Sequence, residues 1–322
     1  MAKDKNRFSF SRFRTYHTCP KQHYYRYVEL VETAEPPQVM PGKLFHEAVE
    51  KTLKQQDITP LFKEFERLVD TGVLAMDRDQ LEYTVNAYFN YYEKDYLREN
   101  TLLVEGNIQE PLDGDDYMTV VIDQVYEFAG ITVLRDIKTS LTKLKYTDMN
   151  VKENQQMLAY IPYAEQHLGV KIDAVEIDEV KFGKIQEVPY TKAGRPSSDR
   201  AKIANVLYED YWNALCEQGL ENEDMYKGAL DYLEKRGHPL FNRIKAHVSE
   251  RMYIDTNLDD LNMTYQLIKG DIDEADIPQY RVRGPLCNYC DYRELCDLDM
   301  TSPSDTDRDI VKRIIKETQK RL

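Results

Sequence analysis

Three cysteines stand within ten residues near the end of the chain, and a fourth stands alone near its start. The cluster reads Cys287-x2-Cys290-x5-Cys296, and the isolated residue is Cys19. Three clustered thiols lack one ligand of a tetrathiolate metal site, and a fourth cysteine from far away in the chain can complete it. The pattern therefore predicts a fold in which the two ends of the chain meet and form one structural unit.

The remaining cysteine and the lack of apolar runs bear on the compartment. Five cysteines are an odd number, and their crowding favours metal ligation in a reducing compartment over a disulfide framework. Cys216, beside Trp212 on an expected helix, is interpreted as a core thiol. No apolar run approaches the ~20 residues of a membrane span, and the first residues lack the apolar segment of a secretory signal. We therefore expect a cytoplasmic globular protein that does not bind membranes.

The length and net charge of the chain are compatible with a nucleic-acid substrate. At 322 residues with 42% hydrophobic content, the chain can bury one large or two modest cores. The net charge of -14 argues against a surface coated in positive charge, but an acidic protein can still carry a local basic groove. The candidates for such a groove are Arg12, Arg14, Lys21, Arg26, Lys143, Lys145, Arg281 and Arg283.

Hydrophobic spacing predicts the order of the elements. Ser9 or Ser11 is expected to cap a helix before Cys19, and helical spacing from 44 to 100 predicts two or three further helices. Strands are predicted at 102–104, 117–128, 131–137, 174–182 and 185–190, with a turn at Ala129-Gly130 and one helix at about 150–168. Residues 200–270 are predicted to be helical, and a basic amphipathic helix at 309–322 is expected to dock onto the body.

An Asp-Ile-Lys triplet closes the second of two neighbouring predicted strands. Alternate side chains share a strand face, so Asp136 and Lys138 point the same way while Ile137 points into the core. The intervening turn folds Asp123 back across from Asp136, so that two carboxylates can share one divalent ion. A lysine beside them can orient or deprotonate a metal-bound water. The alternative is an exposed strand edge on which Asp136 and Lys138 form an ordinary ion pair.

Two helical segments supply further polar residues. Gln156 and Tyr160 are spaced i,i+4 and project from one helix face, where both can bond phosphate or base edges. The segment Gly42-x3-His46-x3-Glu50 places an imidazole near a helix start as a candidate metal ligand, with Glu50 one turn on. A lone histidine on a helix is usually structural, so the combination of these residues carries the hypothesis of a site.

In this order, the motifs resemble the RecB-like branch of the PD-(D/E)XK nuclease superfamily. The resemblance is strongest to its iron-sulfur members: the CRISPR-adaptation nucleases, the AddB nuclease domain and their phage relatives. The matching segments are Cys19-Pro20, Gly42-x3-His46-x3-Glu50, Ile122-Asp123, Asp136-Ile137-Lys138-Thr139, Gln156-x3-Tyr160 and Cys287-x2-Cys290-x5-Cys296. The chain departs from the family pattern at Val121, where a glycine is common, and at Ile137 and Ser140, where the family often has Tyr and Gly.

The resemblance implies a fold, two metal sites and a set of catalytic residues. The fold class is α/β, a restriction-endonuclease-like mixed sheet flanked by helices, with both chain ends joined by a 4Fe-4S cluster. The implied cluster ligands are Cys19, Cys287, Cys290 and Cys296. The implied ligands of Mg2+ or Mn2+ are His46, Asp123, Asp136 and the carbonyl of Ile137. The implied catalytic residues are Asp123, Asp136 and Lys138, supported by Gln156 and Tyr160.

The same resemblance suggests how the chain is divided. Residues 1–100 are expected to form an N-terminal helical region that carries Cys19 and His46, and residues 101–192 the nuclease core. A helical region at 193–280 and a C-terminal cysteine cluster with a basic helix at 281–322 follow. All four segments are expected to build one composite domain.

The implied activity is metal-dependent hydrolysis of DNA, as an exonuclease on ends or single strands in DNA processing, recombination or repair. No Gly-x4-Gly-Lys-Ser/Thr loop is present, so the protein would act alone, as a phage or mobile-element enzyme, or with a helicase or recombination partner. Strand preference, polarity, exo- versus endonuclease action and oligomeric state stay open.

Two other readings compete with this one. The first is a catalytically idle DNA-binding or assembly module that keeps the fold and the structural four-cysteine metal site. An intact set of His46, Asp123, Asp136 and Lys138 argues against it, because an idle site has no chemical reason to retain all four. The second is a protein whose four cysteines bind structural zinc.

Overall fold

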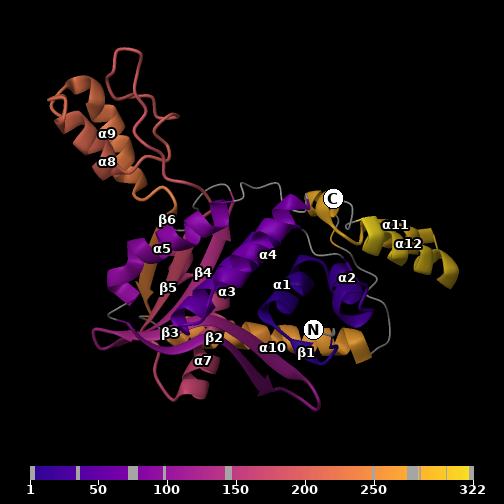
Figure 1. Cartoon of the computed structure of the whole chain (residues 1–322). Coiled ribbons are helices and arrows are strands. Elements are labelled where there is room, and N and C mark those ends of the chain that lie inside the picture. The colour runs from indigo at the N-terminus through magenta and orange to yellow at the C-terminus, as the bar shows by residue number, and fades with distance from the viewer. Residues whose placement is uncertain are drawn as a thin grey trace.

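A mixed β-sheet with helices against both faces forms the centre of the molecule (Figure 1). The structure is a computed structural model that describes residues 4–33, 37–71, 79–96, 99–141, 147–248, 251–273, 282, 284–301 and 303–318. The strands are β1 (Arg7–Phe8), β2 (Asn100–Pro111), β3 (Tyr117–Phe128), β4 (Ile131–Ser140), β5 (Ala174–Lys181) and β6 (Phe241–His247). Strands β2 to β6 lie side by side in chain order, and β1 pairs with the start of β3. The β4–β5 and β1–β3 pairs are parallel and the others antiparallel.

Twelve α-helices lie within the residues that the structure describes. They are α1 (Phe10–Thr18), α2 (Pro20–His23), α3 (Met40–Leu53), α4 (Thr59–Asp70), α5 (Gln80–Tyr96), α6 (Asp148–Lys152), α7 (Gln155–Leu168), α8 (Tyr208–Cys216), α9 (Asp224–Arg236), α10 (Arg251–Asp273), α11 (Arg293–Leu298) and α12 (Asp305–Thr318). A π-helical turn follows α2 at Tyr24–Val28, and 3-10 turns lie at Pro37–Val39, Pro285–Tyr289 and Asp299–Thr301. Helices α3, α4 and α5 are the helices expected between 44 and 100. Ser9 caps α1 as predicted, accepting a hydrogen bond from the Arg12 N–H (3.3 Å).

Two hydrophobic cores fill the spaces on either side of the sheet. Because successive strand residues point to opposite faces, Leu134 and Ile177 enter a core shared with α1, α7 and α10. Ile137 and Val180 enter the other core, shared with α3, α4 and α5. The predicted inward direction of Ile137 is therefore confirmed, and its side chain is buried.

The strand that follows β5 in the chain differs from the prediction. The strand expected at 185–190 is absent, and β5 instead pairs with β6, which lies inside the region expected to be helical. Local alternation cannot reveal a partner that is distant in the chain, because pairing is decided in space. The single helix expected at 150–168 is interrupted before Gln155, where Asn154 caps α7 by accepting a hydrogen bond from the Met157 N–H (3.1 Å).

The chain between β5 and β6 forms a lobe that projects beyond the sheet (Figure 1). This lobe contains α8 and α9 and has a small core of its own, made by Ile203, Val206, Tyr211, Leu215, Leu220, Tyr226, Ala229 and Leu233. Cys216 ends α8 and is exposed, so its interpretation as a core thiol is wrong. The core side of α8 is occupied by Tyr211 and Leu215 instead.

The two ends of the chain pack against each other, as the cysteine spacing predicted. Tyr25 and Val31 share a small core with Tyr292, Leu295 and Ile315. Figure 1 shows the yellow α11 and α12 on the side of the molecule where the indigo α2 lies, and Lys21 of α2 forms an ion pair with Asp299 after α11. The final helix docks through Ile315, while Ile310 and Ile314 stay exposed. Among the described helices, none is long and apolar enough to cross a membrane.

Candidate metal centre and active site

Strands β3 and β4 separate at the predicted site. They pair from the Ala129-Gly130 turn as far as Gln124 and Arg135, and the next residues in register are Asp123 and Asp136. There the Ile137 N–H donates a hydrogen bond to Asp123 Oδ2 (2.6 Å). One oxygen of Asp123 is thereby engaged by the backbone, and Oδ1 is left for another partner. Asp136 and Lys138 also pair with residues of β5, so they do not lie on an exposed sheet edge. The alternative of an ordinary ion pair on such an edge is therefore wrong.

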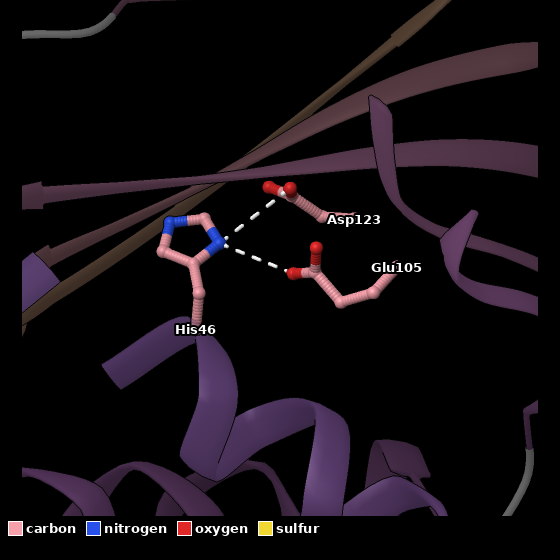
Figure 2. Close-up of side chains that lie close together, drawn as sticks. All are labelled: His46, Glu105 and Asp123. Atoms are coloured by element: carbon pink, nitrogen blue, oxygen red, sulfur yellow. Dashed lines mark ion pairs between the residues drawn. The ribbon is translucent and has the colours of Figure 1, made fainter. Parts of the chain in front are cut away.

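His46 on α3 lies opposite that free oxygen (Figure 2). Its Nδ1 atom is 3.5 Å from Asp123 Oδ1 and 3.5 Å from Glu105 Oε1 on β2. One ligand atom from each of these residues lies within 4.8 Å of the other two, and no other such group of three occurs in the described chain. Burial lowers the pKa of His46, but the two carboxylates outweigh burial and raise it to about 10. A nitrogen and two carboxylate oxygens suit Mn2+ or Mg2+.

Glu105 is the member of this group that the motifs did not indicate. Its neighbours Val104 and Gly106 pair with Gln124 and Ile122, so Glu105 lies across β2–β3 from Asp123. Its backbone is left-handed, with φ 47°. The available signal was Gly106, because a glycine inside a strand often marks an irregular backbone. A Cβ at Gly106 would lie only 2.4 Å from Leu103 Cδ2.

Gly42 accounts for the position of His46. A Cβ at Gly42 would lie 2.6 Å from Thr139 Oγ1 on β4. The absence of a side chain thus lets the first turn of α3 approach the strand that carries Asp136. His46 follows one turn later, on the face of α3 that points to Asp123. The glycine and the histidine of the segment therefore act together.

Lys138 links the strand residues to α7. Its Nζ lies 2.8 Å from Asp136 Oδ2 and 3.0 Å from Oδ1, and it donates to Gln156 Oε1 (3.2 Å). The Gln156 amide in turn donates to the Tyr160 hydroxyl (3.3 Å). Burial and the charge of Asp123 raise the pKa of Asp136 to about 6, against the opposing effects of Lys138 and His46. Four of the predicted site residues are thus linked by successive polar contacts: Asp136, Lys138, Gln156 and Tyr160.

A cavity of about 730 Å3 opens between α3 and the end of the sheet. His46, Glu105 and Asp123 line its wall. The other charged residues that line it are Lys43, Glu47, Glu50 and Lys51. Carboxylates outnumber lysines on this wall, so a phosphate group needs a cation before it can approach.

The four predicted cluster cysteines line a second cavity, of about 230 Å3. None of them forms a disulfide. Burial raises the pKa of the Cys290 thiol, and the neighbouring Cys19 and Cys296 act on it in the same direction. All four residues are described, and no three of their sulfurs lie within 4.8 Å of one another. The four thiols line a common space.

The structure leaves some of the residues predicted to form a basic groove exposed and buries others. Arg12 is fully buried and donates hydrogen bonds to the Lys5 and Arg7 carbonyls and to His23, so it cannot contact DNA. Its guanidinium instead fixes the chain start against α1. Lys21 forms an ion pair with Asp299 (3.4 Å). Arg14 and Arg26 are exposed. Lys143, Lys145, Arg281 and Arg283 lie outside the described residues.

Comparison with known families agrees with the geometry. A family model described as the PD-(D/E)XK nuclease superfamily matches residues 7–297. No curated protein matches the chain. The matched range includes His46, Glu105 and Asp123 and all four cysteines of the second cavity.

Proposed function

The chain belongs to the PD-(D/E)XK nuclease superfamily, and from this premise we propose that it is a divalent-metal-dependent nuclease that hydrolyses phosphodiester bonds in DNA. The observation that carries the proposal is the separation of β3 from β4. Where the strands separate, Asp123 of β3 approaches His46, and Asp136 of β4 forms an ion pair with Lys138.

The resemblance implies a role for each residue, and the contacts between the residues support it. His46, Asp123, Asp136 and the Ile137 carbonyl would hold the cation. When bound, the cation supplies a Lewis acid and lowers the pKa of its water. Lys138 can orient the attacking water and offset charge on the phosphate. Gln156 fixes the Lys138 ammonium, and Tyr160 holds the Gln156 amide.

We propose that the cysteine cavity holds a 4Fe-4S cluster, as the resemblance implies, with structural zinc as the alternative. All four cysteines line this one cavity, and thiolates are ligands of both iron-sulfur clusters and structural zinc. The iron and zinc contents of protein purified without oxygen distinguish the two. In this proposal the cluster has a structural role and holds the two chain ends together.

The finer features of the proposal rest on the resemblance to the RecB-like branch. The protein would act in the cytoplasm as an exonuclease on DNA ends, in processing, recombination or repair, alone or with a helicase partner. Exposed Arg14 and Arg26 are available for phosphate contacts. Because such contacts release counterions, DNA binding should weaken steeply with salt.

The test uses protein purified without oxygen and incubated with Mg2+ or Mn2+. Substrates are end-labelled linear DNA, closed circular DNA, single strands and RNA of equal length. We expect linear DNA to be shortened from its ends, and EDTA to stop cleavage without preventing binding. Lys138→Ala should lower the rate at least about 10²-fold, whereas Lys51→Ala, which removes a charge from the cavity wall, should not.

Other outcomes would establish a different activity. Nicking of closed circles at the rate of linear DNA would establish an endonuclease. RNA cleaved as fast as DNA would reject the substrate class. Binding of DNA with no cleavage in either metal would establish the idle module.

A further inference from the structure

We propose that Glu105 is a direct ligand of the catalytic cation, completing a set with His46 and Asp123. This inference rests on the proposed function and adds a residue to its site. It assigns to β2 a part in metal binding that the sequence motifs give only to α3, β3 and β4.

The first support is the direction of the ligand atoms. Asp123 Oδ2 accepts the Ile137 N–H, so Oδ1 is its available oxygen, and this atom and Glu105 Oε1 both lie 3.5 Å from His46 Nδ1 (Figure 2). Adjacent ligands of an octahedral cation with bonds of about 2.1 Å lie roughly 3 Å apart. A small contraction of the three side chains would therefore bring them into a coordination shell.

The second support is the arrangement around Asp136. Its Oδ1 accepts a hydrogen bond from Lys138 Nζ (3.0 Å), while its buried Oδ2, 2.8 Å from the same Nζ, makes no hydrogen bond within the described part of the chain and can still ligate the cation. Asp136 lies outside the group whose ligand atoms lie within 4.8 Å of one another, so it would join the cation beside that group. Glu105 supplies the second negative charge in that group. With Asp123 it balances a divalent cation while His46 binds as a neutral ring.

The third support is the backbone of β2. A glutamate with φ 47° occupies a region that side chains disfavour and that persists where the surroundings impose it. The alternation of β3 also reverses opposite Glu105, because Ile122 and Val125 enter the same core although they are three residues apart. The backbone of β2 is thus irregular at Glu105, and the alternation of β3 breaks within the segment 122–125 that carries Asp123. Both carboxylates approach His46 there.

The experiment measures Mn2+ binding in the absence of DNA, from the loss of the free Mn2+ signal in electron paramagnetic resonance. Glu105→Gln should raise the Kd at least about tenfold, as ligand-shell changes do. The matched control is Glu50→Gln, which removes the same charge from the same cavity wall and should change the Kd by less than about fivefold, as a screened charge does. Circular dichroism checks the fold of each variant, and Glu105→Asn, which tolerates a left-handed backbone, replaces Glu105→Gln if that variant does not fold.

A Kd for Glu105→Gln within a few fold of wild type would overturn the inference. An equal loss in Glu50→Gln would also overturn it, because the effect would then come from the field of the wall and not from ligation. A failure of the proposed nuclease function would give a different result. Wild-type protein would then bind Mn2+ in a Glu105-dependent way but cleave no nucleic acid.

Discussion

At the scale of single residues, His46 couples metal binding to pH. Its pKa of about 10 in the metal-free protein lies above the ordinary value of 6.5, so the ring is protonated at pH 8 and a cation must displace that proton. The affinity for Mn2+ should therefore rise by up to about tenfold per pH unit between roughly pH 7 and 9. Calorimetry in two buffers of different ionisation enthalpy should show about one proton released per ion.

The stability of the metal-free protein should follow the opposite trend. A group whose pKa is raised on folding stabilises the protein fully below its unfolded pKa, and that contribution is lost as the pH rises through the folded pKa. For His46 this window runs from about 6.5 to about 10. His46→Gln should abolish both the proton release and this part of the pH dependence. Proton release that persists in His46→Gln would show that another group titrates with the metal.

A second residue-scale feature is a buried set of charges on the opposite face of β4 from Asp136. Arg135 contacts Glu99 and Glu176, each at 2.6 Å, and Arg243 donates two hydrogen bonds of 2.6 Å to Asp178. Burial raises the pKa of Asp178, but Arg243 and Arg135 outweigh it and lower the pKa below its ordinary value. These charges join β4, β5 and β6 beneath α5.

Breaking this set should cost stability without touching the metal site. Arg243→Met leaves Asp178 buried with one fewer cation and should lower the free energy of unfolding by about 3 kcal/mol or more. Lys245→Met is the matched control, since Lys245 is more exposed and lies 3.3 Å from Glu176; its cost should stay below about 1 kcal/mol. Urea denaturation measures both. Equal effects of the two variants would show that the Arg243–Asp178 pair is no more important for stability than the exposed Lys245.

At the scale of elements, the contact between α3 and β4 places His46. In Gly42→Ala the new Cβ would lie 2.6 Å from Thr139 Oγ1, which is too close for two unbonded atoms. Helix α3 should therefore move away from β4. We expect weaker Mn2+ binding, by about tenfold or more as for other changes that shift a ligand, and slower cleavage. Thr139→Ala alone should have little effect.

The double variant Gly42→Ala/Thr139→Ala tests that cause directly. It removes the clashing hydroxyl while keeping the extra methyl group on α3, and the Thr139 Cβ is 3.8 Å away, an ordinary contact. Metal binding should therefore recover in the double variant. A double variant no better than Gly42→Ala would mean that the glycine matters for another reason, such as helix propensity.

At the scale of the whole molecule, the cysteine cavity joins the chain ends. Tyr25 donates a hydrogen bond to Asp299 (2.6 Å), and Arg308 pairs with Glu29 (2.7 Å) and with Asp299. These contacts already bring the ends together. A cluster ligated from both ends would close a loop of most of the chain and add several kcal/mol, in order of magnitude.

Cys19→Ser should therefore lose iron, lose the absorbance near ~400 nm and unfold at a lower temperature. Cys216→Ser is the control, because Cys216 is exposed on α8 in the projecting lobe and lies outside the cavity. Iron analysis, absorbance and thermal unfolding of oxygen-free protein give the answer. Colourless protein with stoichiometric zinc would reject the iron-sulfur proposal.

Patterns that are local in the sequence carried a large part of the fold. Alternation along β3 and β4, with the positive-φ turn at Ala129 and Gly130, was enough to predict that Asp123 lies next to Asp136, because a short turn leaves two strands one register. Helical spacing was enough for α3 to α5, and the cysteine spacing predicted that the two ends meet. In each case the interaction that decides the structure is between near neighbours or between residues with a distinctive chemistry.

Tertiary structure alone decided the rest. The partner of β5, the burial of Arg12 and the exposure of Cys216 depend on elements far away in the chain. Glu105 joins His46 only because β2 pairs with β3 in one register and its backbone turns left-handed there. A carboxylate in a strand looks the same in sequence wherever it points. Its direction comes from strand pairing and packing, which only the folded chain specifies.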